Sequence, residues 1–191
     1  MRYIHTKLDG VIILEPDIKG DDRGYFYEVL RKDELEAALG HKCDFVQENE
    51  SSSGSCVIRG LHFQRAPHAQ SKLIRVTRGA ILDVAVDIRR GSATFGQYVA
   101  VELSDSNHRA LFVPRGFAHG FAVLRGEARV VYKCDNYYAP EAEGSIRWND
   151  PTIGIDWGID TDNAVLSAKD MAAPTIEACN ELFDNTIDYY A

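Results

Sequence analysis

Two histidines stand in stretches that otherwise look like apolar β-strands. His62 lies in VIRGLHFQ (57–64) and His119 lies in PRGFAHGF (114–121). A strand histidine taken alone is more often structural than catalytic. Here Arg59, Gln70 and Lys72 surround the first histidine, and two such strands of a barrel can project inward together. The pattern favours a polar cavity that moves protons.

A divalent metal is the alternative use of a histidine pair. The metal-binding pattern typical of small β-barrels is HxH followed by an acid. This chain has Gln64 where the second histidine would stand, and no carboxylate follows until Asp83. Glutamine is a poor substitute for imidazole, so we predict no metal and a cavity that works through proton transfer.

The segment VVYKCDNYYAPEAEG (130–144) supplies aromatic groups. Tyr132 lies within the expected strand, and Tyr138 lies just beyond it. A tyrosine at an apolar site can act as an acid or stack on a flat heterocycle, although aromatic packing is the ordinary alternative. In LSAKD (166–170), Lys169 and Asp170 would by default form a solvated surface pair.

Cations are spread over several segments. Arg23 in DDRGYFYE (21–28), Arg59, Lys72 and Lys169 supply more positive charge than a small sugar needs. Guanidinium groups bind phosphate through two parallel hydrogen bonds, although each arginine alone also fits a surface ion pair. No glycine-rich phosphate loop is present, so side chains would have to hold a phosphate.

The bulk composition limits the possible classes of function. The chain has 191 residues, 45% of them apolar and 26% charged, which is typical of a soluble globular protein. Its formal charge of -8 opposes binding to nucleic acid. Four cysteines form no CxxC pair, and there is no signal pattern or membrane-spanning apolar run. We expect a cytoplasmic protein with free thiols and no membrane partner.

Short β-branched and aromatic runs separated by turn residues predict an antiparallel sandwich or barrel. One short helix is expected at 31–40, where acids come early and a glycine closes the pattern. We predict one domain over 1–191, with a core at about 3–150 and a segment 151–191 that packs on the barrel and ends in a helix. The expected strands are Gly10–Glu15, Gly24–Leu30, Phe45–Ser51, Lys72–Arg78, Ala80–Asp87, Gln97–Glu102, Arg109–Val113, Ala118–Leu124 and Ala128–Cys134.

An ordered set of motifs resembles the dTDP-4-dehydrorhamnose 3,5-epimerase family. The set comprises DDRGYFYE, QEN, RGLHFQ, QSKLIRVTRGAILDVAVDIRRGS, PRGFAHGF, YKCDNYY and LSAKD, and it runs from about residue 3 to residue 175. The resemblance implies a mainly β, cupin-type jelly roll, a homodimer, and no metal or organic cofactor. It also implies a substrate, dTDP-4-dehydro-6-deoxy-D-glucose, inverted at C3 and C5 to the L-rhamnose precursor.

The resemblance implies roles for individual residues. His62 matches the family's catalytic base, Asp170 the carboxylate that orients it, and Tyr132 the general acid. Tyr138 matches a position that stacks against thymine. The remaining matched positions bind the sugar nucleotide: Arg23, Glu28, Gln47, Glu48, Asn49, Arg59, Lys72, His119, Glu143 and Lys169.

The chemistry of the implied reaction explains this choice of residues. A proton beside a ketone is acidic because the enolate places its charge on oxygen, so a base and an oxygen-binding cation are both needed. His62 and Lys72 suit these roles, and inversion also needs Tyr132 on the other face. Three alternatives stay open: an enzyme that epimerises one carbon or isomerises the keto sugar, a non-catalytic sugar-nucleotide binding module, and a metal-dependent oxygenase.

Overall fold

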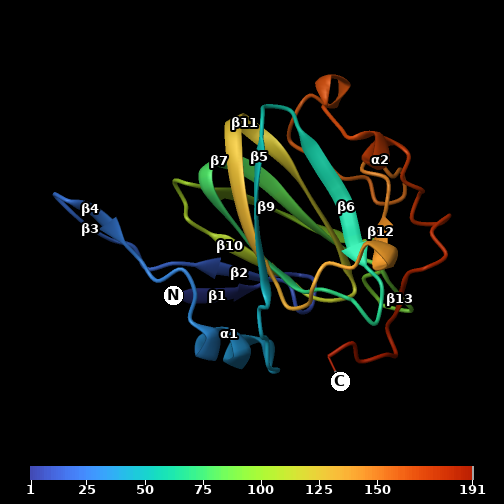
Figure 1. Cartoon of the computed structure of the whole chain (residues 1–191), viewed down its shortest axis with the longest axis horizontal. Coiled ribbons are helices and arrows are strands. Elements are labelled where there is room, and N and C mark those ends of the chain that lie inside the picture. The colour runs from blue at the N-terminus through green and yellow to red at the C-terminus, as the bar shows by residue number, and fades with distance from the viewer. Residues whose placement is uncertain (191) are drawn as a thin grey trace.

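The computed structural model describes residues 1–190, and it is built mainly from antiparallel strands (Figure 1). This is the mainly β, jelly-roll architecture that the sequence predicts. The path through the main sheet runs β1 (Arg2–His5), β2 (Ile12–Glu15), β10 (Ala110–Val113), β7 (Lys72–Asp87), β11 (Phe117–Cys134), β6 (Ile58–Gln64) and β12 (Glu143–Ser145). Two further strands join it, β5 (Gln47–Ser53) on β11 and β9 (Tyr98–Ser104) on β7.

The two longest strands form the centre of the sheet. β7 has 16 residues and β11 has 18, and each covers two strands of the sequence prediction. Their ladder runs from Phe117 opposite Asp87 to Cys134 opposite Lys72. The turns expected between the predicted strands are absent from β7 and β11, and irregularities of register lie in their place within these continuous strands. Gly79, with φ of 76°, adopts a left-handed conformation at one of them.

The N-terminal part of the chain contains a helix and a hairpin that lie outside the main sheet. The predicted helix is confirmed as α1 (Lys32–Leu39), which has two acids in its first turn and is capped at its C-terminus by Gly40. The expected strand Gly24–Leu30 is shorter, because only β4 (Gly24–Phe26) pairs, with β3 (Lys19–Asp21). This hairpin extends away from the sheet (Figure 1). Strand β1 was not expected from the sequence.

The segment after residue 150 packs against the outside of the barrel. Trp157, Ile176 and Phe183 join one buried apolar cluster with Ile58 and Leu61 of β6. No helix among residues 1–190 is long and apolar enough to cross a membrane.

The prediction that the C-terminal segment ends in a helix is wrong. A single α-helical turn, α2 (Ala168–Met171), is followed by Pro174, which cannot donate the next helical hydrogen bond. The backbone groups after Pro174 form hydrogen bonds with distant residues. Ile176 N donates to Asp150 Oδ2 at 2.7 Å, and β13 (Phe183–Asp184) pairs with β8 (Arg89–Arg90). Two 3₁₀ turns, η1 (Pro140–Ala142) and η2 (Thr161–Asn163), lie earlier in the chain.

Candidate active site

Several barrel strands open onto one polar cavity of about 390 Å³. Seven of the predicted site residues line it, and they come from β5, β6, β7, β11, β12 and the loop after β11. These seven are Gln47, Asn49, His62, Lys72, Tyr132, Tyr138 and Glu143; the other lining residues are Phe63, Gln64, Gln70 and Cys134.

His62 and Asp170 form a pair at this cavity, although 108 residues separate them in the chain. The His62 Nε2 atom lies 2.5 Å from Asp170 Oδ1. Asp170 belongs to α2, and its backbone N–H donates to the Ser167 hydroxyl at 3.1 Å, which caps the helix. Only 3% of Asp170 is exposed. The default interpretation of LSAKD as a solvated pair therefore does not hold for Asp170.

The surroundings of Asp170 favour its ionised form. Burial by itself would raise the pKa of this carboxyl group. The hydrogen bond and the positive charge of His62 oppose that effect, together with hydrogen bonds from Ser167 and the Gly60 backbone, and they hold the pKa below its ordinary value. A buried carboxylate that binds one ring nitrogen fixes the tautomer of His62 and leaves its other nitrogen available.

Two glycines bring the strand of His62 close to β11. A Cβ atom on Gly60 would lie 2.6 Å from the Gly120 Cα atom, and one on Gly120 would lie 2.7 Å from the Arg59 carbonyl oxygen. Gly60 also has φ of 119°, which other residues rarely adopt. The close approach sets the register in which His62 faces His119.

Lys72 and Tyr132 provide two further groups whose protonation is shifted. Lys72 begins β7 opposite Cys134 of β11. Desolvation by burial lowers the pKa of Lys72. Burial also raises the pKa of Tyr132, with Cys134 adding to the effect and Arg59 opposing it. The cavity therefore holds a phenol that keeps its proton and an ammonium group that loses its proton more readily than usual.

His119 occupies a buried place behind the cavity. Its Nε2 atom lies 2.8 Å from Asp83 Oδ1, and 8% of the histidine is exposed. Asp83 is fully buried, and its Oδ2 atom has no hydrogen-bond partner within residues 1–190. The two histidines of these His–Asp pairs face each other on the neighbouring strands β6 and β11, and of the two His62 lines the cavity.

Polar contacts link the residues at the cavity mouth. The Tyr138 hydroxyl donates to Glu143 Oε2 at 3.2 Å, and the Tyr138 backbone N–H donates to Gln47 Oε1 at 2.9 Å. Lys169 forms an ion pair with Glu143. Burial would raise the pKa of Glu143, but the hydrogen bond and charge of Lys169 hold it below its usual range. The exposed ring of Tyr138 leaves a flat face for a ligand.

Two predicted binding residues on neighbouring strands lie beside the cavity and do not line it. Arg59 donates from Nε to the Ser53 hydroxyl at 2.9 Å and borders a second hollow of about 340 Å³, which His62 also lines. Glu48 forms an ion pair with Lys133 at the surface.

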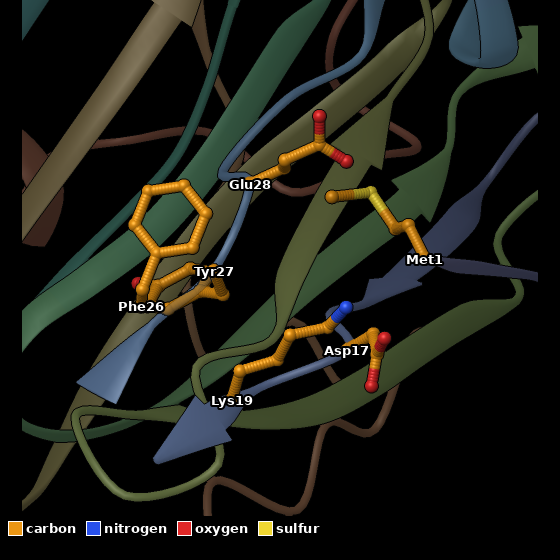
Figure 2. A pocket seen from close by; sticks show the side chains of 6 residues that line it. All are labelled: Met1, Asp17, Lys19, Phe26, Tyr27 and Glu28. Carbon is orange, nitrogen blue, oxygen red and sulfur yellow. The ribbon is translucent and has the colours of Figure 1, made fainter. Parts of the chain in front are cut away.

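Arg23 lies at the turn of the projecting hairpin and Glu28 lies two residues after it, and both are outside the two hollows. Arg23 pairs with Asp21, and 90% of its side chain is exposed. Figure 2 shows Glu28 at a separate hollow of about 180 Å³, lined by Met1, Asp17, Lys19, Phe26, Tyr27 and Glu28. Within this single chain, the hairpin residues and the cavity residues do not meet.

Two of the lining residues, Cys134 and Gln64, are not among the predicted site residues. Cys134 follows Tyr132 by two positions on β11, and this alternation could have identified it. Gln64 holds the loop after β11, because its Nε2 atom donates to the Tyr137 carbonyl at 3.1 Å and its Oε1 atom accepts from Ala139 N at 2.8 Å. Among residues 1–190 no three His, Cys, Asp or Glu side chains gather as a metal site would require.

Comparison with known proteins gives consistent matches along most of the chain. A family model described as dTDP-4-dehydrorhamnose 3,5-epimerase matches residues 5–178. The dTDP-4-dehydrorhamnose 3,5-epimerase of Salmonella typhimurium is 51% identical over 177 residues, which cover 93% of this chain and 96% of the relative.

Solved structures agree with the sequence matches. The crystal structure of dTDP-6-deoxy-D-glucose-3,5-epimerase from Legionella pneumophila, in complex with dTDP-4-keto-L-rhamnose, superimposes with a TM-score of 0.91. It is 46% identical and covers 96% of this chain and 97% of its own. A 3'-monoepimerase from Streptomyces bikiniensis, in complex with dTDP-quinovose, superimposes with a TM-score of 0.89. It is 34% identical, and the match covers 95% of this chain and 92% of the monoepimerase. The chain therefore belongs to the dTDP-4-dehydrorhamnose 3,5-epimerase family.

Proposed function

We propose that this chain is an isomerase that inverts C3 and C5 of dTDP-4-dehydro-6-deoxy-D-glucose to give dTDP-4-dehydro-L-rhamnose. The observation that carries the proposal is the His62–Asp170 pair, 2.5 Å apart, on a cavity that Lys72 and Tyr132 also line. The similarity to 3,5-epimerases over nine-tenths of the chain supports the substrate.

The proposed mechanism separates proton removal from proton return. His62 takes the proton from the carbon beside the C4 ketone, and Asp170 stabilises the imidazolium that forms. The electron pair of the broken C–H bond forms a double bond to C4, and the π electrons of the ketone move to the C4 oxygen, where the ammonium group of Lys72 stabilises the enolate. Tyr132 then donates its proton to the opposite face of the carbon as the ketone re-forms. His62 releases the captured proton to solvent and Tyr132 regains one from solvent, so both groups are ready again. The same two steps act at the second carbon.

Neither the base nor the cation suffices alone. A positioned base supplies ~10²–10⁴ in rate and one oxyanion donor ~10²–10³. Enzymes typically reach ~10⁶ or more, so the base at the carbon and the cation at the C4 oxygen must act in the same step. A cavity that holds both is the minimum requirement, and His62 and Lys72 line one cavity here.

Solvent exchange tests the proposed reaction. The purified protein is incubated in D₂O with dTDP-4-dehydro-6-deoxy-D-glucose, and the product is analysed by NMR. The proposal predicts deuterium at both C3 and C5 together with inversion at both carbons. Ligand binding without any exchange would contradict catalysis and identify a binding module.

A single-carbon epimerase is the second candidate, because a 3'-monoepimerase shares this fold at 34% identity. The 3,5-epimerase of Salmonella typhimurium stands closer, at 51%. In the same D₂O experiment a single-carbon epimerase labels and inverts C3 only. Movement of the ketone from C4 to C3 would identify a keto-sugar isomerase.

We also propose that the protein is a homodimer in which the hairpin of one subunit completes the site of the other. Arg23 and Glu28 match nucleotide-binding positions but stand away from the cavity of their own chain. The hairpin also exposes two large aromatic side chains, with Tyr25 63% and Phe26 70% exposed. These exposed aromatic side chains could pack against a second subunit. The cation beside them, Arg23, would then reach the nucleotide bound in the cavity of that subunit.

Mixing two impaired variants, assayed at a substrate concentration well below the wild-type KM, tests the shared site. His62→Ala and Arg23→Ala each damage both sites of a homodimer. In a mixed dimer, one site receives intact His62 from one subunit and intact Arg23 from the other. Exchange of subunits is expected to restore activity, and a mixture no more active than its components would contradict the shared site.

The proposed partner is a small dTDP-sugar, with neither nucleic acid nor membrane involved. The net charge of -8 supports this, since binding to a nucleic acid would be opposed. We place the reaction in the cytoplasm. All four cysteines within residues 1–190 are free, as is usual in a reducing compartment.

A further inference from the structure

Three strand ends meet beside Lys72. Ser71 precedes β7, Asp135 follows β11, and Arg115 follows β10 by two residues. The Asp135 carboxylate joins them, because Oδ1 accepts from Ser71 N at 2.6 Å and Oδ2 accepts from Arg115 Nε at 3.0 Å. Since Lys72 is the residue after Ser71, this junction fixes the backbone from which its side chain enters the cavity.

Tyr190 closes the junction from a distant part of the chain. Its hydroxyl oxygen lies 2.7 Å from Ser71 Oγ and accepts from Arg115 N at 3.0 Å. The Arg115 guanidinium carbon lies 5.1 Å from the centre of the Tyr190 ring, and the His41 ring lies 4.0 Å away. Ser71 itself is fully buried. One phenol oxygen therefore connects the strand ends of β7 and β10.

The phenol of Tyr190 stays neutral under working conditions. Burial raises its pKa to about 12, against smaller opposing effects from Ser71 and the Arg115 backbone. Its single proton is therefore available for the Ser71 hydroxyl, while its oxygen accepts from the backbone of Arg115. A hydrogen bond of this kind between buried groups holds a fixed geometry.

The segment that carries Tyr190 also contacts the other side of the cavity. Phe183 packs edge-on against Phe63, with ring centres 6.0 Å apart, and Tyr189 packs on Phe183 at 4.8 Å. Phe63 follows His62 and lines the cavity. In Figure 1 the segment, in red, passes β6 and β12 and ends near α1. It lies beyond residue 178, where the match to the family model ends.

We propose that Tyr190 is a positioning residue that acts through Ser71 to hold the ammonium group of Lys72 where the enolate oxygen forms. The inference rests on the proposed role of Lys72. It assigns a catalytic contribution to a segment outside the family match. Tyr190 itself touches neither the cavity nor the reacting carbons.

A double-mutant cycle tests the inference. Tyr190→Phe removes only the bridging oxygen and keeps the ring. Loss of one hydrogen bond predicts a fall in kcat of about 3–10-fold with KM unchanged. The matched control is Tyr189→Phe, whose hydroxyl accepts from Asp184 N at 2.8 Å, away from the strand junction. The control should keep the wild-type kcat.

The same Tyr190→Phe change is then made in a Lys72→Met background, with Lys72→Gln as a second background and thermal unfolding as the check on folding. Long incubations in D₂O allow slow turnover to be measured. The proposal predicts no further loss, because the group that Tyr190 positions is already gone. The same fold-loss in both backgrounds, or wild-type kcat in Tyr190→Phe alone, would overturn it. Full activity in Lys72→Met would instead overturn the proposed role of Lys72.

Discussion

The barrel cavity and the β3–β4 hairpin both carry residues of the proposed site, but those in the cavity are held by buried partners and those on the hairpin are exposed. In the cavity, His62 is fixed by Asp170, which is 3% exposed. On the hairpin, 90% of the Arg23 side chain is exposed, and its neighbour Phe26 is 70% exposed. The single chain thus assembles the groups proposed for the chemistry but leaves part of the nucleotide contacts unassembled. Variants in the two regions should therefore change different kinetic constants.

The largest effect is expected for His62→Ala in the cavity. Loss of the positioned base should lower kcat by ~10²–10⁴. Binding of the nucleotide should be little changed, because that part of the ligand does not rely on the imidazole. Steady-state kinetics and a titration with dTDP measure the two quantities separately. A variant that loses dTDP affinity by the same factor would show that His62 serves binding instead.

Lys72→Met should produce the second largest effect. Removing the cation at the enolate oxygen should lower kcat by ~10²–10³. In the wild type, burial lowers the pKa of Lys72, so deprotonation should reduce kcat at a pH below the ordinary lysine value of about 10.4. Lys72→Arg keeps its charge and should lose this alkaline decline. A decline at the same pH in Lys72→Arg would assign it to another group.

Substitution on the hairpin should affect binding and leave chemistry largely intact. Arg23→Ala removes the proposed charged contact to the diphosphate, which should raise KM by about 10-fold to 30-fold at nearly constant kcat. Arg125→Ala is a suitable control because it removes an exposed surface cation that pairs with Glu102, which is not among the predicted site residues. Equal effects of both variants would mean that general electrostatics, and not the hairpin contact, governs binding.

The smallest expected effect concerns stability and its dependence on pH. The folded pKa of Asp170 lies below its usual value, so its stabilising contribution is complete above the unfolded pKa of about 3.9. The contribution is lost as the pH falls through the folded pKa. At pH 6 the free energy of unfolding of Asp170→Asn should therefore be about 1–2 kcal/mol lower than that of the wild type. The difference should become smaller below pH ~4. Urea unfolding at both pH values measures this; a constant difference would contradict it.

Periodicity in the sequence predicted most of the strands but not the contacts between distant segments. Alternation along β11 places Tyr132 and Cys134 on one face, and both line the cavity. No local pattern could bring Asp170 to His62 across 108 residues, and only the family resemblance suggested it. The C-terminal segment does not end in a helix as expected, because after α2 its backbone contacts β8 and Asp150, and these contacts outweigh a weak helical propensity.

The central claim is that separate groups remove and return the proton, and Tyr132→Phe tests it most directly. With dTDP-4-dehydro-6-deoxy-D-glucose in D₂O, NMR measures deuterium exchange and inversion at each carbon of the same sample. The account predicts that exchange continues, because His62 is intact, while inversion falls by ~10². Exchange and inversion that fall by the same factor, or inversion at the wild-type rate, would contradict it.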